Sequence, residues 1–323
     1  MNVNDAFDTY QRYVNADESS LTTARERRDL FKSAFEPQPD ISRVLRSGSL
    51  ARGTQRDPIH DVDMILIYDG LQHPEWGAPG RSAEDALDYT RDQVKSLLGT
   101  SDGSFAKEVR LARWRNHAVK CWLDEPEAEG AFTVDAMPAL RRDGMLIIPE
   151  AISKTWIPAH PEFLIDLVDA KHAQWNKFAG TVRMLKAWGS EQDIKIKSLV
   201  MEVLATEFLP TAKTRFAALD TFFTAAAFAV ENGHRVSDPA DVCGEIQADL
   251  EYGALADLLR NAASLASAAV AKQVNNNPHG AITLWGELFG AGFPVPPAGS
   301  AEDAAAGTAA ADGPRRVKDT PQG

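Results

Sequence analysis

The fold of this chain is decided by residues 48 to 69, GSLARGTQRDPIHDVDMILIYD. A small-residue turn, Gly48 and Ser49, comes before two carboxylates, Asp61 and Asp63, at the start of an apolar run. Successive side chains of a strand point to opposite faces, so the two carboxylates point the same way while the residue between them points into the core. Two like charges this close disfavour each other unless a cation lies between them. The stretch therefore predicts a cation site at the mouth of a strand.

A later strand supplies a third carboxylate. The segment AFTVDAM, residues 131 to 137, places Asp135 among apolar residues. If this strand lies beside MILIY, residues 64 to 68, Asp135 joins the same site as the first two carboxylates. Mg²⁺ is a hard cation that prefers oxygen ligands. Three carboxylates can hold two divalent ions about 3.5–4 Å apart, an arrangement that clamps the attacking and leaving oxygens of a phosphoryl transfer.

The turn before the strand fits a phosphate. Gly48 lets the backbone come close to a ligand, and amides at a turn or helix start favour anions. Ser49 adds a hydroxyl, and Arg52 and Thr54 are further candidate donors. Each motif alone is weak, because an Asp-x-Asp at a strand end is usually solvated. The combination, in this order and spacing, is much stronger.

Composition limits the class of protein. The length of 323 residues suggests about two domains, and 44% hydrophobic with 25% charged residues is ordinary for a globular protein. The net charge of −12 argues against passive coating of nucleic acid. The two cysteines, Cys121 and Cys243, form no metal or disulfide motif, which fits a reducing compartment. With no signal peptide and no apolar run of about 20 residues, we expect a cytoplasmic protein with no membrane span.

Periodicity predicts a two-lobed α+β fold. We expect a catalytic lobe over residues 1–155, a mixed sheet with helices that include the N-terminal helix. A helical lobe is expected over 156–293, and a disordered tail over 294–323, where no large apolar residue occurs beyond two valines. The expected strands are 64–68, 109–123 and 131–137, and the expected helices are one or two within 3–34, then 82–98, 176–188, 196–209, 217–231 and 248–274.

These residues resemble a known family. Gly-Ser, then Asp-x-Asp on a strand, then a later Asp on another strand, is the signature of the polymerase-β-like nucleotidyltransferases. Within them, residues 48–69 closely resemble the bacterial cGAS/DncV-like nucleotidyltransferases (CD-NTases, the SMODS domain). The resemblance covers roughly residues 40–210 and continues in VDAMPAL (134–140), TWIPAHPEF (155–163), GTVRMLKAWG (180–189) and KIKSLVMEVLA (195–205).

The resemblance implies a function. Such enzymes join NTPs into a cyclic di- or trinucleotide second messenger for anti-phage (CBASS) signalling, and an effector protein then binds the product. Asp61 and Asp63 would hold two Mg²⁺ ions, or Mn²⁺, and Asp135 would complete the site. Lys186 and Ser198 match the residues that contact nucleotide phosphates, although a surface lysine with a buried stem explains Lys186 about as well.

Several alternatives and further expectations accompany this resemblance. An RNA or tRNA nucleotidyltransferase could share the fold, and so could an inactive nucleotide-binding module. Leu199 stands where some relatives carry a base-stacking aromatic residue, which leaves the choice of base open. The chain lacks a cysteine–histidine zinc insertion, so activation by duplex DNA is not expected. Some relatives are conjugated through their C-terminus, which makes Gly323 a candidate, although an idle tail is the simpler explanation.

Overall fold

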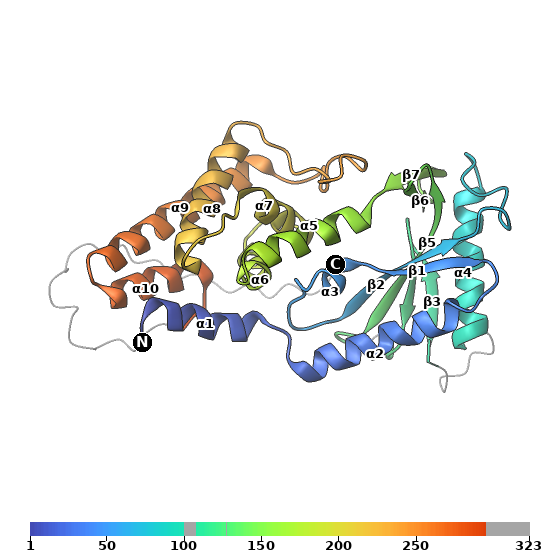
Figure 1. Cartoon of the computed structure of the whole chain (residues 1–323), viewed down its shortest axis with the longest axis horizontal. Coiled ribbons are helices and arrows are strands. Elements are labelled where there is room, and N and C mark those ends of the chain that lie inside the picture. Colours follow the sequence, from blue (N-terminus) through green and yellow to red (C-terminus); the bar gives the residue numbers. More distant parts are fainter. Residues whose placement is uncertain (100–107, 127, 295–323) are drawn as a thin grey trace.

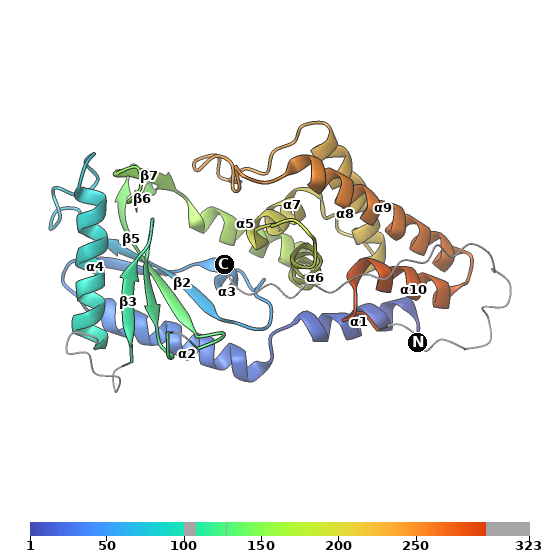
Figure 2. The ribbon, with the colours of Figure 1, turned by 180° about the vertical axis from the view of Figure 1, so that it is seen from behind.

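The structure is a computed structural model that describes residues 1–99, 108–126 and 128–294. The molecule is elongated, with a sheet and its helices at one end and a helical bundle at the other (Figure 1). Figure 2 shows the same two lobes from behind. The predicted two-lobed α+β fold is confirmed.

The described residues form helices and strands in an order that changes from mixed to purely helical along the chain. The strands are β1 (Ile41–Arg46), β2 (Asp61–Tyr68), β3 (Leu111–Trp114), β4 (Val119–Trp122), β5 (Thr133–Arg142), β6 (Met145–Glu150) and β7 (Thr155–Ala159). The helices are α1 (Val3–Val14), α2 (Glu18–Phe35), α3 (Gly48–Ala51), α4 (Ser82–Leu98), α5 (Pro161–Gln174), α6 (Phe178–Ser190), α7 (Ser198–Phe208), α8 (Arg215–Glu231), α9 (Tyr252–Val274) and α10 (Pro278–Phe289).

One mixed sheet forms the first lobe. Its strand order is β1-β2-β5-β4-β3, with β6 paired to β5 and β7 to β6. β2 and β5 run parallel, and the other neighbours are antiparallel. Helices α2 and α4 cover one face, where Phe31, Phe35, Leu87 and Val94 are completely buried against the sheet. The opposite face of β2 and β5 carries a smaller buried cluster that includes Ile65, Ile67 and Ala139, so a site on that face must lie near the start of the two strands.

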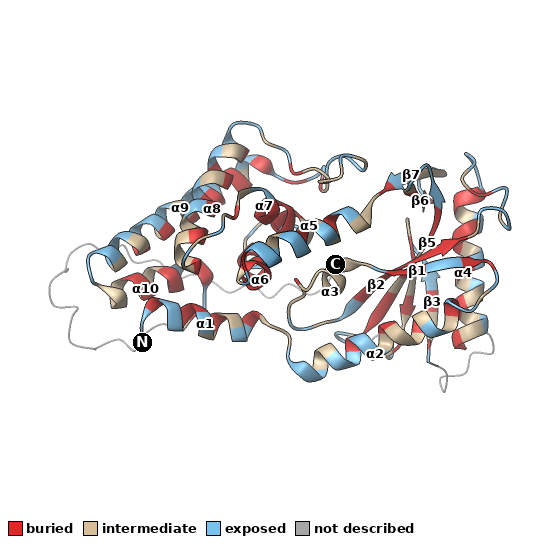
Figure 3. Ribbon diagram, viewed as in Figure 1, coloured by how far each residue is buried: buried red, intermediate tan, exposed pale blue. Residues whose placement is uncertain are grey.

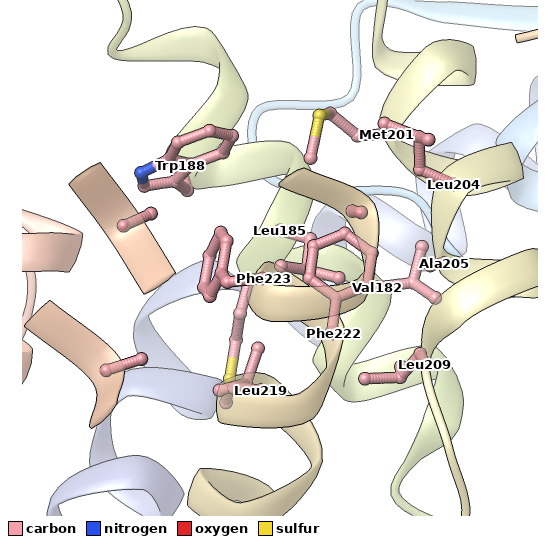
Figure 4. Packing of buried hydrophobic residues seen from close by; sticks show 14 of the residues in the cluster. Val182, Leu185, Trp188, Met201, Leu204, Ala205, Leu209, Leu219, Phe222 and Phe223 are labelled. Carbon is pink, nitrogen blue, oxygen red and sulfur yellow. The ribbon is translucent and has the colours of Figure 1, made fainter. Parts of the chain in front are cut away.

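A second hydrophobic core holds the helical lobe together. Figure 4 shows aromatic and aliphatic side chains of α6, α7 and α8 packed against one another. Trp188 meets Phe223 edge to face, with ring centroids 5.2 Å apart. Figure 3 shows the buried residues gathered on the sheet and on the inner sides of these helices.

Helix α1 belongs to the helical core, which differs from the expected lobe boundary. Phe7 is 1% exposed and packs edge to face against Trp285, with centroids 5.1 Å apart. Tyr10 packs against Phe289 in the same cluster. The sequence places the whole N-terminus in the sheet lobe because α1 and α2 show similar helical patterns. Only α2 packs there.

Several elements differ from the sequence-based expectation. The expected strand 109–123 is a hairpin of β3 and β4. Six elements were not predicted: β1, α3, β6, β7, α5 and α10. The last four contain a proline, a residue that weakens the strand signal of β6 and β7. Apart from Pro294, the expected disordered tail lies outside the described residues.

No helix of the described part of the chain is both long enough and apolar enough to cross a membrane.

Candidate active site

Parallel pairing of β2 with β5 brings the predicted carboxylates together. Asp63 is the register partner of Asp135, and Asp61 is the partner of Thr133, two positions earlier. Register partners share a face and their Cβ atoms lie about 5 Å apart. The intervening Val62 is buried on the other face, in the core beneath α2 and α4. The conditional expectation that the two strands are neighbours is confirmed.

The turn before β2 is built against one of these carboxylates. Gly48 opens α3 with a φ of +70°, a conformation that favours glycine. A Cβ on Gly48 would lie 1.8 Å from Asp63 Oδ2. The Ser47 amide donates to the Asp63 carbonyl at 3.1 Å, which fixes the turn to the strand. Gly48 is therefore required both for the backbone conformation and for the close approach to Asp63.

The carboxylates carry an electrostatic penalty. Burial, followed by the nearby charges of Asp61 and Asp135, raises the pKa of Asp63 to about 6 against the opposing effect of Arg52 and Lys120. Burial also raises the pKa of Asp135, which Lys120 partly offsets. Two buried carboxylates side by side are costly without a positive charge between them.

The donor set fits a divalent cation. Asp135 Oδ1 is buried and accepts no hydrogen bond from any described residue. An oxygen of this kind, next to a second carboxylate, is a suitable ligand for Mg²⁺. Over the residues that the structure describes, no three carboxylate, imidazole or thiol groups already converge tightly enough to form a metal-binding cluster. The register brings the ligands to neighbouring positions, and their side chains would have to turn toward a bound ion.

Beside the site lies a buried ion-pair network. Glu202 is completely buried and accepts from Arg52 Nε at 2.6 Å, Thr54 Oγ1 at 2.9 Å and Lys186 Nζ at 3.0 Å. Lys186 also donates to the Thr54 carbonyl at 3.0 Å. Arg183 donates to the Gly53 carbonyl. The loop that follows α3 is thereby fastened to α6 and α7.

This network engages three residues that were expected to donate hydrogen bonds to phosphate. Arg52 and Thr54 are occupied by Glu202, although Arg52 also lines the neighbouring cleft. Lys186 is 4% exposed, so it is not the surface lysine of the simpler explanation. Its contact with a phosphate stays a prediction, and in this structure its ammonium group holds Glu202 and the loop.

The two remaining predicted residues, Ser49 and Ser198, do not line the cleft between the lobes, although Leu199 beside Ser198 does. Ser49 is half-buried on α3, and Ser198 is exposed at the first position of α7. Leu199, the next residue, lines a cleft of about 330 Å³ together with Ser47 and Arg52. The other walls are mostly apolar and come from both lobes: Ile65, Met137, Ile148, Ala159, His160, Pro161, Leu164, Asp238, Pro239, Cys243, Gly244, Glu245 and Ile246.

Sequence reasoning missed two residues of the site. Glu202 follows Ser198 by one helical turn in an apolar helix, and a lone carboxylate there was the available signal. Lys120 is the register partner of Asp135 on β4. Its position could not be found without the strand pairing, because 109–123 was expected to be one strand.

The chain has the fold of the CD-NTase nucleotidyltransferases. It resembles the structure of E. coli MS115-1 CdnC with ATP at a TM-score of 0.68 and 17% identity, covering 91% of this chain and 99% of that one. It also resembles Vibrio cholerae DncV cyclic AMP-GMP synthase in complex with the linear intermediate 5′ pppA(3′,5′)pG, at a TM-score of 0.55 and 12% identity, covering 90% and 87%. The predicted resemblance to CD-NTases is confirmed.

Sequence comparison gives one curated relative. It is the cyclic AMP-AMP-AMP synthase of Escherichia coli (strain MS 115-1), 24% identical over 200 residues. The match spans 58% of this chain and only 56% of the length of that relative. No protein-family model matches the sequence.

Proposed function

We propose that this chain is a CD-NTase that joins NTPs into a cyclic di- or trinucleotide second messenger. One observation carries the proposal: Asp63 pairs with Asp135 across parallel strands, directly beside the Gly48 turn. Nucleotidyl transfer needs carboxylates and a phosphate-binding turn on one face of a sheet, and the resemblance to CD-NTase structures supports the same reaction.

The proposed chemistry begins with two nucleotides. Asp61, Asp63 and Asp135 would hold two Mg²⁺ ions, which when bound acidify the acceptor hydroxyl and neutralise the phosphates. A ribose hydroxyl of one NTP attacks the α-phosphorus of the other. The new O–P bond forms as the bond to pyrophosphate breaks, and the acidified hydroxyl releases its proton to water. A second transfer within the linear product closes the ring.

Binding roles follow from the placement of the other residues. The Gly48 turn and Ser49 would receive the donor phosphates, with Ser198 approaching from the helical lobe. Because Leu199, Ile65 and Met137 give the cleft an apolar lining, a base could be held there without an aromatic partner. The CD-NTase resemblance also supports a cytoplasmic protein in bacterial anti-phage signalling, with an effector that binds its product. C-terminal conjugation at Gly323 stays a proposal.

The decisive experiment is a product assay. The pure protein is incubated with all four NTPs and Mg²⁺ or Mn²⁺, treated with phosphatase, and analysed by mass spectrometry. A phosphatase-resistant cyclic product, absent from the Asp61→Asn/Asp63→Asn variant, is expected. Extension of an added RNA without a cyclic product would instead indicate a polynucleotide transferase. Tight Mg²⁺–NTP binding without either product would indicate the inactive binding module.

A further inference from the structure

The face of the sheet opposite α2 and α4 carries opposite charges on neighbouring strands. Asp63 on β2 pairs with Asp135 on β5, and Asp135 pairs with Lys120 on β4. Paired residues share a face, so a carboxylate, a second carboxylate and an ammonium group stand in one row across three strands. Val119 and Cys121, which flank Lys120, are buried in the core on the other face. Lys120 therefore points to the same side as the catalytic carboxylates.

A second cation and an aromatic ring complete this patch. Trp122 pairs with Thr133, two positions along the same face. The Lys120 ammonium lies 5.8 Å from the centroid of the Trp122 ring, and the Arg115 guanidinium lies 5.9 Å from it. Both distances are within the range of a cation–π contact. The ring thus keeps two positive charges together at the edge of the carboxylate site, on a chain whose net charge is −12.

The position of this patch suits one part of the substrate. It lies on the β5 side of the carboxylates, away from the Gly48 turn, which touches Asp63 on β2. If the Gly48 turn binds the phosphates of the donor nucleotide, the acceptor nucleotide needs a separate binding site for its own triphosphate. The hydroxyl of that acceptor lies at Asp135. Neighbouring strands are about 4.8 Å apart, so Lys120 is one strand away from Asp135.

We infer that Lys120 and Arg115, held on the Trp122 ring, form the binding site for the 5′-triphosphate of the acceptor nucleotide. The inference rests on the proposed function and names the subsite that distinguishes acceptor from donor. A triphosphate has several negative charges and oxygens only, and a paired ammonium and guanidinium supply the matching charge and donors. The same cations also lower the repulsion among the carboxylates while the site is empty.

The test separates the two nucleotide roles. A 2′,3′-dideoxy NTP has no hydroxyl to offer and acts only as donor. An α,β-methylene NTP cannot release pyrophosphate and acts only as acceptor, as does the corresponding nucleoside, which lacks the triphosphate. We expect Lys120→Met and Arg115→Gln each to lower kcat/KM about tenfold or more for the α,β-methylene NTP, and less than twofold for the nucleoside.

The matched control is Lys95→Met, on α4 at the opposite face of the sheet, which should change neither value. Equal losses with both acceptors would overturn the inference, because Lys120 would then act only by neutralising the carboxylates. No loss with either acceptor would overturn it as well.

A second readout does not depend on turnover. An α,β-methylene NTP with a photoreactive group on its γ-phosphate is crosslinked to the protein and the labelled peptides are mapped. Labelling within residues 114–123 of the wild type, lost in Lys120→Met and kept in Lys95→Met, is expected. Absence of wild-type label there overturns the inference. If the segment is labelled but neither acceptor reacts in the wild type, the proposed function fails while the triphosphate site stands.

Discussion

Gly48 is the residue whose replacement tests the site most directly. An alanine there would place its methyl group 1.8 Å from Asp63 Oδ2, so the carboxylate or the turn must move. A displacement of about 1 Å at a reacting centre can lower the rate about 100-fold. We expect Gly48→Ala to reduce kcat for NTP condensation by about that factor.

Gly53 provides the matched control for this substitution. It also has a positive φ, +64°, but a Cβ there meets no atom within 4 Å. Gly53→Ala therefore introduces the same kind of backbone strain, about 1 kcal/mol, without touching Asp63. Equal activity losses in the two variants would show that strain, and not the approach to Asp63, is responsible.

Asp63 predicts an unusual dependence of stability on pH. Its pKa in the folded, metal-free protein is about 6, above the value of about 3.9 in an unfolded chain. The folded state therefore holds the proton more tightly, and this contribution to stability is complete below about pH 4 and lost as pH rises through about 6. The protonation state of Asp63 thus contributes to the stability of the folded protein.

The measurement compares wild type with Asp63→Asn in the presence of a chelator. At pH 8 we expect the Asn variant to melt about 2 °C or more above the wild type, and the difference should shrink as the pH falls, vanishing only below about pH 4. Mg²⁺ should raise the melting temperature of the wild type at pH 8 and leave that of the variant nearly unchanged. A wild type that is the more stable protein at pH 8 without metal would contradict the assignment.

At the scale of elements, the loop after α3 is tied to the helical lobe. Glu202 of α7 and Lys186 of α6 hold the loop after α3 through buried charges. Removing one partner of a buried pair costs about 3–5 kcal/mol, because the other charge is left without compensation. We expect Lys186→Met to lower the free energy of unfolding by about this amount in denaturant titrations.

Lys195→Met is the control, since Lys195 is exposed in the segment before α7. It should change the free energy of unfolding by less than about 0.5 kcal/mol. If Lys186→Met leaves stability unchanged and weakens only Mg²⁺–NTP binding, Lys186 reaches the phosphates directly and its pairing with Glu202 is secondary.

Alternation along strands was sufficient to predict the carboxylate site. Asp61 and Asp63 share a face in any strand, and the only further requirement, that the strand of Asp135 be a neighbour, was met. The partners of Lys186 could not be predicted in this way. Glu202 and Thr54 come from other elements, and their distance from Lys186 depends on how α6, α7 and the α3 loop pack together. Local periodicity carries no information on that packing.

At the scale of the whole molecule, α1 packs against α10, which lies far from it along the chain. Phe7 contacts the rings of Trp285, Phe289 and Phe293. Truncating a buried phenylalanine costs about 3–5 kcal/mol. We expect Phe7→Ala to destabilise α8, α9 and α10 and to leave β2 and β5 protected.

Native-state hydrogen exchange distinguishes these regions, because each reports its own opening free energy. The control is Phe228→Ala, since Phe228 is 68% exposed on α8 and its loss should change little. Faster exchange in the sheet than in the helices of Phe7→Ala would contradict the assignment of α1 to the helical lobe.

The placement of α1 has a consequence for how the protein folds while it is being synthesised. All strands of the sheet, with α2 and α4, are synthesised before helices α5 to α10, so the sheet lobe can form while the ribosome is still translating. Helix α1 leaves the ribosome well before α10 and cannot bury Phe7 until α10 has emerged. During that interval its apolar side lacks its final partner. The newborn chain therefore exposes the apolar side of α1 during this interval, and holdase chaperones should bind this helix.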